Sequence, residues 1–141
     1  FEMKEAINMQ WLSDMAFEAN VDGHKIYIDS SAEHGGKDLG ARPKSLMMVA
    51  LAGCTGMDVV SILKKMRVEF DSFNVRVEGE LSDEHPKKYI GMKVVFTFTG
   101  TNVPLDKVEK AVALSKERYC GVQANYMASF PVTHEIIINP S

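Results

Sequence analysis

The sequence contains few cysteines and none of the patterns typical of a metal centre. Only two of its 141 residues are cysteine, too few for the disulfide framework of a small secreted protein. The four histidines lie in unrelated segments, and no CxxC or HExxH pattern occurs. We therefore expect no metal and no cofactor. In a reducing compartment, a bridge between the two cysteines would be catalytic or regulatory rather than structural.

The chain also lacks an excess of positive charge and a long apolar run. Its net charge is −3 and its 16 Lys and Arg residues are scattered, which argues against a nucleic-acid partner. The longest uncharged stretch, residues 45–57, is too short to cross a bilayer. No basic leader followed by an apolar segment opens the sequence. We expect a cytoplasmic protein with no membrane partner.

What the sequence does contain is the composition of an ordinary globular domain, 45% hydrophobic and 25% charged. No internal repeat or linker divides it, so we expect one domain over residues 1–141. A turn at 21–23 indicates a hairpin near the N-terminus, and the polar loop 82–88 joins an antiparallel pair. Alternating apolar residues predict strands around 11–17, 25–28, 73–77, 92–98 and 132–138.

Two helical stretches separate these strands. A glycine-rich loop, residues 30–40, leads to Pro43, where a helix begins whose first half is apolar on every side. A second helix follows Pro104, and one of its faces carries Val108, Val112, Ser115 and Tyr119. The class is α+β, in the order β-β, long helix, β-β, helix, β. The long helix needs more cover than one small sheet, which a homodimer would supply unless both sheets wrap it in a single chain.

Cys54 lies in the long helix and Cys120 near the end of the second. The thiolate is the nucleophile, so a reactive cysteine needs a cation or a helix N-terminus to lower a pKa of about 8.5. Because Cys54 is in mid-helix, the fold must bring the cation to it. The candidates are Arg42, Lys44, Lys25 and Arg118. Asp58, one turn later, opposes ionisation of the Cys54 thiol unless it is paired.

Gly53 and Gly56, close to Cys54 on either side, each cost about 1 kcal/mol in a helix relative to alanine. Close backbone packing explains them, and so does an approach path for a substrate. Either cysteine alone could be a small buried hydrophobe. Because both lie in helices that the sheet order can bring together, one could instead resolve a sulfenic acid formed on the other.

Two segments give the most specific pattern in the chain. The first is PKSLMMVALAGCTGMDVV, residues 43–60, and the second is SKERYCGV, residues 115–122. Together they resemble the OsmC/Ohr superfamily over nearly the whole chain. The resemblance is closest to the YhfA-like subgroup, which has Asp-Val-Val-Ser-Ile-Leu after the cysteine, here residues 58–63.

The resemblance implies an OsmC-like fold, in which antiparallel sheets wrap a long buried central helix and two chains intertwine as a homodimer with active sites at the interface. It implies a thiol-dependent hydroperoxide reductase in oxidative-stress defence. Cys54 would attack the peroxide, Cys120 would resolve the product to a disulfide, and a dithiol such as a dihydrolipoyl group would restore both thiols. The substrate-binding residues would be Lys44, Met47, Met57, Tyr126 and Phe130.

The chain departs from the peroxidase pattern at one point. Peroxidase members of the superfamily carry an acid just after the proline that pairs with an arginine. This chain has Lys44 and Ser45 there, and no arginine before Arg42. Either Arg42 or Lys44 supplies the positive charge, or the peroxidase machinery is incomplete. The alternative function is a non-catalytic homodimer that binds a small apolar ligand or senses redox state.

Overall fold

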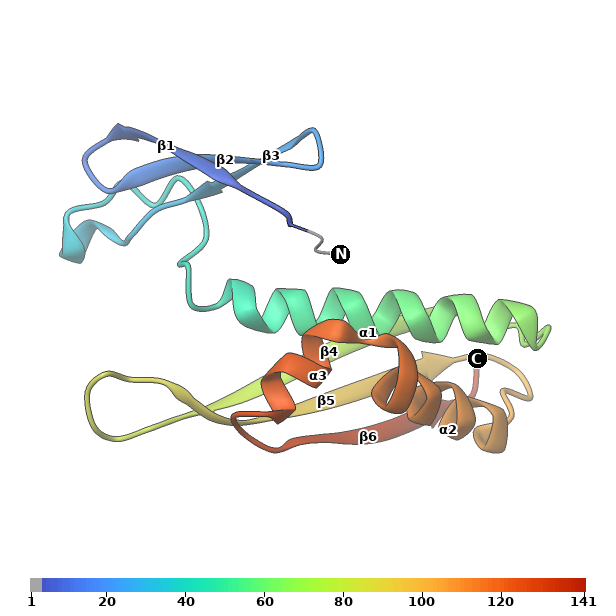
Figure 1. The fold of residues 1–141 in the computed structure, drawn as a ribbon. Helices are drawn as coiled ribbons and strands as arrows, with labels where there is room; N and C mark the ends of the chain where they lie inside the picture. Colours follow the sequence, from blue (N-terminus) through green and yellow to red (C-terminus); the bar gives the residue numbers. More distant parts are fainter. Residues whose placement is uncertain (1–3) are drawn as a thin grey trace. The chain divides into compact units, whose positions relative to one another are not determined.

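The computed structural model describes residues 4–141, which fall into two compact units, one ending at Met47 and one beginning at Met48. Figure 1 shows their helices and strands, which confirm the α+β class. The single domain expected from the sequence stays a prediction. In chain order the elements are β1 (Asn8–Ser13), β2 (Ala16–Val21), β3 (His24–Ile28), η1 (Ala32–His34), α1 (Leu46–Lys65), β4 (Ser72–Leu81), β5 (Tyr89–Thr99), α2 (Leu105–Leu114), η2 (Ser115–Tyr119), α3 (Gly121–Met127) and β6 (Val132–Asn139).

The N-terminal unit is built on an antiparallel sheet in the order β1-β2-β3. The predicted hairpin is β2–β3, and its turn places Asp22 and Gly23 at φ 51° and 81°, in the left-handed region. The alternation around Trp11 and Phe17 predicts one strand. That prediction is wrong, because the chain reverses at Asp14 (φ 49°) and Trp11 of β1 pairs with Phe17 of β2.

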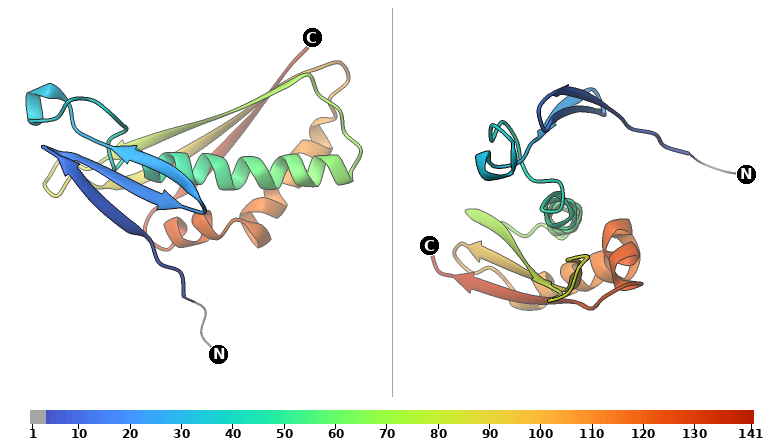
Figure 2. Two further views of the ribbon diagram at one scale, coloured as in Figure 1. Left: turned by 90° about the horizontal axis from the view of Figure 1, so that it is seen from above. Right: turned by 90° about the vertical axis from the view of Figure 1, so that its left-hand side faces the viewer.

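The C-terminal unit contains a sheet in the order β4-β5-β6. β4 and β5 are antiparallel, as predicted, whereas β5 and β6 are parallel. The expectation of antiparallel sheets is therefore wrong for β6, because α2, η2 and α3 form a helical crossover between two strands that run in the same direction. The helices lie over one face of this sheet (Figure 2). The residues of β5 buried most deeply are Met92, Val94, Phe96 and Phe98.

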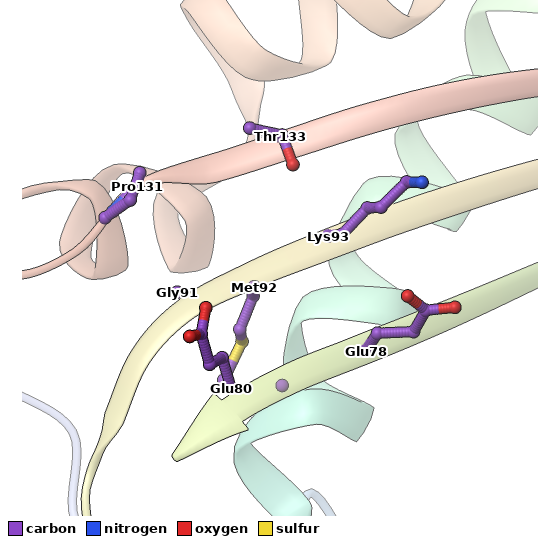
Figure 3. A pocket seen from close by; sticks show the side chains of 8 residues that line it. Glu78, Glu80, Gly91, Met92, Lys93, Pro131 and Thr133 are labelled. Atoms are coloured by element: carbon purple, nitrogen blue, oxygen red, sulfur yellow. The ribbon is translucent and has the colours of Figure 1, made fainter. Parts of the chain in front are cut away.

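A hollow of about 480 Å³ lies over β4, β5 and the start of β6. Figure 3 shows Glu78, Glu80, Lys93 and Thr133 around it. The Lys93 ammonium is 2.9 Å from a carboxylate oxygen of Glu135 on the neighbouring strand. The sequence reasoning did not single out these residues, and the hollow contains neither cysteine.

Helix α1 packs on the sheet through one stripe of side chains. The buried residues of this stripe are Leu51, Thr55, Gly56, Val59 and Leu63. Other apolar residues of α1 stay in solvent, since Val49 is 62% and Met57 76% exposed. Within the C-terminal unit, one side of the helix is therefore covered, and its burial on every side stays a prediction.

Among the helices in residues 4–141, α1 alone has the length and the apolar composition that a membrane-spanning helix needs. Its buried stripe packs against the apolar face of the sheet, as the core helix of a globular fold does. It also carries Asp58, whose carboxylate oxygen Oδ2 accepts a hydrogen bond from Ser115 at 2.9 Å. These contacts favour a core helix over a membrane span.

The segment after α2 departs from the single helix that the sequence predicts. Residues Ser115–Tyr119 form a π-helical turn, and Cys120 is extended (φ −83°, ψ 99°) and caps α3. Ser115 is buried, but Tyr119 is 60% exposed although the α-helical pattern puts it on the same face. The wider π turn rotates the chain relative to an α-helix, so the apolar face does not continue beyond Ser115.

Candidate active site

The two cysteines lie side by side, Cys54 in α1 and Cys120 at the start of α3. Their sulfur atoms and a carboxylate oxygen of Asp58 all lie within 4.8 Å of one another. Both thiols are free; Cys54 is partly buried and Cys120 is 3% exposed. The crossover that carries η2 brings Cys120 to α1, which confirms that the fold can pair the two cysteines.

The environment of Cys120 keeps it protonated. Its sulfur accepts a hydrogen bond from the backbone N–H of Gln123 at 3.2 Å, and its own N–H donates to the carbonyl oxygen of Ser115 at 2.8 Å. Burial, and then the hydrogen bond with the Cys54 thiol, raise the pKa of Cys120 to about 12. At neutral pH Cys120 is therefore a thiol rather than a thiolate.

Asp58 is the acid of this site. It follows Cys54 by one helical turn, so the two side chains lie on the same face of α1. The Ser115 hydroxyl donates to Asp58 Oδ2 at 2.9 Å, and Ser115 itself is buried. The sequence did not identify a partner for Asp58, and the structure shows that its partner is the hydroxyl group of Ser115. Two sulfurs and one carboxylate make three donors, fewer than the four of a structural zinc site, and we assign no metal to them.

A cleft of about 390 Å³ opens beside Asp58. It is lined by Asp58, Ser61, Ile62, Lys65, Leu114 and Tyr119. Lys65 lies two turns after Asp58 on the same face of α1, a spacing that could have marked it as a cation near the site. The sequence reasoning looked for cations outside this helix and missed it. The cleft gives the acid of the site a route to solvent.

A second, apolar hollow of about 600 Å³ lies along the next face of α1. Met57, predicted to bind substrate, lines it together with Gly53, Gly56 and Phe73. A Cβ atom on Gly56 would come within 3.3 Å of Val75, so close packing explains this glycine. A Cβ atom on Gly53 would meet nothing within 4 Å. Close packing therefore explains the glycine at position 56 but not the glycine at position 53, where a side chain would have room.

Two further predicted substrate-binding residues lie near the end of the crossover. The rings of Tyr126, in α3, and Phe130 have centroids 5.5 Å apart. Burial, and then the neighbouring Tyr89 and Cys120, raise the pKa of Tyr126. Tyr126 is thus close enough to Cys120 for electrostatic interaction, while Phe130 belongs to the buried core. Their role toward a substrate stays a prediction.

Comparison with known proteins identifies the family. Residues 35–135 match the family model described as OsmC-like protein. The chain belongs to the OsmC-like protein family. Protein YhfA of Escherichia coli strain K12 is 29% identical over 127 residues, which cover 89% of this chain and 92% of YhfA. The resemblance stated from the two sequence segments is confirmed.

Solved structures agree with this assignment. The crystal structure of a hypothetical protein from Aquifex aeolicus VF5 matches with a TM-score of 0.85 and 28% identity, over 100% of this chain and 99% of that one. The organic hydroperoxide resistance protein OhrB of Bacillus subtilis matches with a TM-score of 0.66 and 16% identity, over 95% and 98%. The second likeness shows the fold alone. The predicted OsmC-like fold is confirmed.

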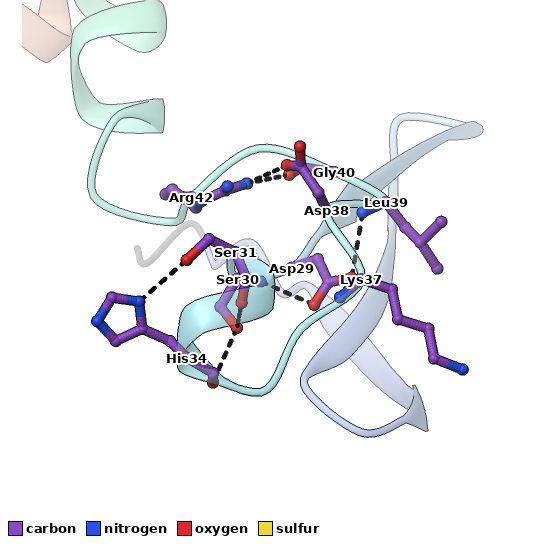
Figure 4. Close-up of polar contacts among 9 residues, drawn as sticks. All are labelled: Asp29, Ser30, Ser31, His34, Lys37, Asp38, Leu39, Gly40 and Arg42. Atoms are coloured by element: carbon purple, nitrogen blue, oxygen red, sulfur yellow. Dashed lines mark hydrogen bonds and ion pairs between the residues drawn. The ribbon is translucent and has the colours of Figure 1, made fainter.

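The loop before α1 is ordered by Asp29. Its carboxylate accepts hydrogen bonds from the backbone N–H groups of Ser30 at 2.7 Å, Lys37 at 3.2 Å and Leu39 at 3.1 Å (Figure 4). Burial alone would raise the pKa of Asp29, but these N–H groups and the charge of Arg42 lower it below its ordinary value of 3.8.

Arg42, the predicted activator, is held at the end of this loop. Its Nη1 donates to Asp38 at 2.6 Å and to the carbonyl oxygen of Gly40 at 3.0 Å (Figure 4). The acid that pairs with an arginine is therefore four residues before it rather than just after Pro43. The sequence reasoning missed Asp38, because the pair forms across a loop whose conformation the sequence pattern does not predict. Lys44 and Met47 also belong to the N-terminal unit, and their roles stay predictions.

Proposed function

We propose that this OsmC-like protein is a thiol-dependent hydroperoxide reductase in the cytoplasm. The observation that supports this most is the pair of free thiols, with sulfurs within 4.8 Å and unequal exposure. The Cys54 thiolate attacks the peroxide, the O–O bond breaks, and an alcohol leaves after taking up a proton. Cys120 then attacks the sulfenic acid on Cys54, forming a disulfide and releasing water.

The different environments of the two thiols support this order of reaction. Cys54 is the more exposed sulfur, so a peroxide from solvent reaches it first. Cys120 is buried and protonated, which suits a thiol that reacts only with a sulfenic acid beside it. A small dithiol, or a dihydrolipoyl group, would reduce the disulfide by thiol exchange.

The apolar hollow, whose lining includes Gly53 next to Cys54 in the sequence, supports an organic substrate class. Its wall combines Gly53, Met57 and Phe73 in about 600 Å³, room for an alkyl or acyl chain. Two structural relatives that share the fold at 16% identity are named organic hydroperoxide resistance proteins. We expect organic hydroperoxides to be reduced faster than hydrogen peroxide, because their chains remove this apolar wall from water.

A cation must stabilise the Cys54 thiolate, and Arg42 is the proposed group. Its ion pair with Asp38 fixes the guanidinium, as a paired acid would in the peroxidase pattern. Lys44, close by in sequence, is the second candidate. Replacing Arg42 by Met removes the charge but keeps much of the side-chain volume. It should slow iodoacetamide labelling of Cys54 near neutral pH, because a smaller fraction of the thiol is ionised.

Peroxide turnover tests the proposal. Purified protein with dithiothreitol or dihydrolipoamide should consume cumene hydroperoxide, and Cys54→Ser should abolish this activity. Cys120→Ser should still react once, after which excess peroxide over-oxidises Cys54 and intact mass rises by whole oxygen atoms. If the wild-type protein consumes neither cumene hydroperoxide nor hydrogen peroxide faster than Cys54→Ser, the reductase function is wrong.

The apolar hollow also favours a second candidate, a non-catalytic dimer that binds a small apolar ligand. Iodoacetamide labelling separates the two functions. A reductase requires a Cys54 that labels quickly near neutral pH, whereas a binding protein would show slow labelling that rises only above the ordinary thiol pKa. A fluorescent fatty acid that binds Cys54→Ser as tightly as wild type, in a protein without turnover, would support the binding function.

A further inference from the structure

Formation of the disulfide requires a proton to leave Cys120. Because its pKa is about 12, only about one molecule in 10⁵ carries the thiolate at pH 7. Cys120 as a residue is also almost entirely removed from water, at 3% exposure. A buried thiol in this state attacks slowly unless a neighbouring group accepts its proton.

The group placed to do so is Asp58. A carboxylate oxygen of Asp58 lies within 4.8 Å of both sulfurs, the one that must attack and the one that it attacks. Ser115 ties the acid to the same turn of chain as Cys120. Its hydroxyl donates to Asp58 at 2.9 Å, and its carbonyl oxygen accepts from the N–H of Cys120 at 2.8 Å.

Two other features fit a proton-accepting acid. The contacts of Ser115 occur in the π turn η2, and such turns occur frequently at functional sites. Asp58 also lines the cleft of about 390 Å³ that it shares with Lys65 and Tyr119. Water released in the resolving step can leave by that cleft, and the acid can exchange its proton with solvent there.

We propose that Asp58 is the general base of the resolving step, a role that rests on the proposed reductase function. As the Cys120 sulfur attacks the sulfenic sulfur of Cys54, Asp58 takes the proton from Cys120. The S–S bond forms, the S–O bond of the sulfenic acid breaks, and the departing hydroxide takes the proton from Asp58 to become water. Two sulfurs end in a disulfide, Asp58 returns to its carboxylate form, and no further oxidant is needed.

Asp58→Asn tests the role, because the amide keeps the size of the side chain and can still accept a hydrogen bond from Ser115. Reduced protein is mixed with one equivalent of cumene hydroperoxide, quenched and analysed by intact mass. Loss of the reduced form should change less than about threefold, whereas disulfide formation should slow by about 10²-fold or more, the usual size of general base catalysis. Asp106→Asn, an exposed acid of α2, is the matched control and should behave as wild type.

A second assay avoids peroxide, so that failure of the proposed reductase function can be distinguished from failure of the proposed role of Asp58. Dithiobis-nitrobenzoate modifies Cys54 and releases one thionitrobenzoate; attack by Cys120 then releases a second. Asp58→Asn should slow only the second release. If Asp58→Asn does not fold, Asp58→Ala with added formate replaces it, because formate restores a base without restoring packing.

The outcomes decide between the claims. Wild-type rates of disulfide formation in Asp58→Asn, or a second thionitrobenzoate release that formate does not accelerate in Asp58→Ala, would overturn the role of Asp58. Loss of the first step in Asp58→Asn would also overturn it, because the acid would then act on Cys54. If peroxide does not react but the second release depends on Asp58, the reductase function fails and the general base remains.

Discussion

The two glycines near Cys54 contribute differently to the stability of the fold. Gly53 faces open space, so an added methyl group costs no contact and removes the entropic penalty of glycine in a helix. We expect Gly53→Ala to raise the free energy of unfolding by about 0.5–1 kcal/mol. Gly56→Ala should gain less or lose stability, because Val75 must move away from the new Cβ atom. Urea unfolding of both variants measures the difference, and equal gains would contradict it.

At the scale of single residues, the sequence predicted that Cys54 and Cys120 could lie together, but not the hydrogen bonds around them. The cysteine pair follows from residue type and from helices that one sheet order can join. The hydrogen bond from Ser115 to Asp58 could not be predicted, because it depends on the π turn that places Ser115 toward α1. Lys65 could be predicted from helical spacing, because it follows Asp58 by two turns of α1. Asp38 could not, because it meets Arg42 across a non-helical loop.

The loop from Asp29 to Arg42 is the element with a defined pH dependence. The folded pKa of Asp29 is below its ordinary value of 3.8, so in the unfolded chain this carboxyl binds a proton first as the pH falls. Its contribution to stability is therefore present above about pH 4 and is lost as the pH falls through the folded pKa.

Asp29→Asn tests this loop. The three N–H groups donate to both carboxylate oxygens of Asp29, and asparagine keeps only one acceptor oxygen. At least one N–H group therefore loses its partner, so the variant should be less stable than wild type at pH 7. The difference in urea midpoint should shrink as the pH is lowered from 5 toward 3, because protonation removes the same charge from the wild type. A constant difference over that range would show that the carboxylate charge does not matter. Asp71→Asn, at an exposed acid, is a suitable control.

Among the elements, period-two and helical patterns predicted β4, β5, β6 and α1 because each buries one face or stripe against a core. The reversal at Asp14 and the parallel pairing of β6 could not be predicted in the same way. A left-handed turn residue leaves the apolar alternation unbroken, and strand direction is set by the crossover rather than by the strand's own residues.

Each of the two units exposes large apolar side chains to solvent. Val49 and Met57 of α1 are 62% and 76% exposed, and Trp11 of the N-terminal sheet is 56% exposed. We expect a homodimer that covers the exposed side of α1. Light scattering should give about twice the chain mass of 15.7 kDa.

Met57→Glu should shift this protein toward the monomer, because the dimer would bury an unpaired charge. The urea midpoint of the wild type should rise with protein concentration, because the dimer is linked to folding. The midpoint of Met57→Glu should be lower and should not depend on protein concentration. Leu105→Glu places the same charge at an exposed leucine of α2, at 49% exposure, and should leave the dimer intact. A wild-type protein that remains a monomer at high concentration would rule out the dimer.

The positions of Cys54 in α1 and Cys120 at the start of α3 have a topological consequence. A bond between them would close a covalent ring of roughly 65 residues that contains β4, β5 and α2 but leaves β6 and the N-terminal unit outside. A ring of that size lowers the entropy of the unfolded chain by an amount worth about 4 kcal/mol. Lys87 and Lys88 lie in an exposed loop inside the ring, so a single tryptic cut there would leave the two fragments tethered until a reductant opens it.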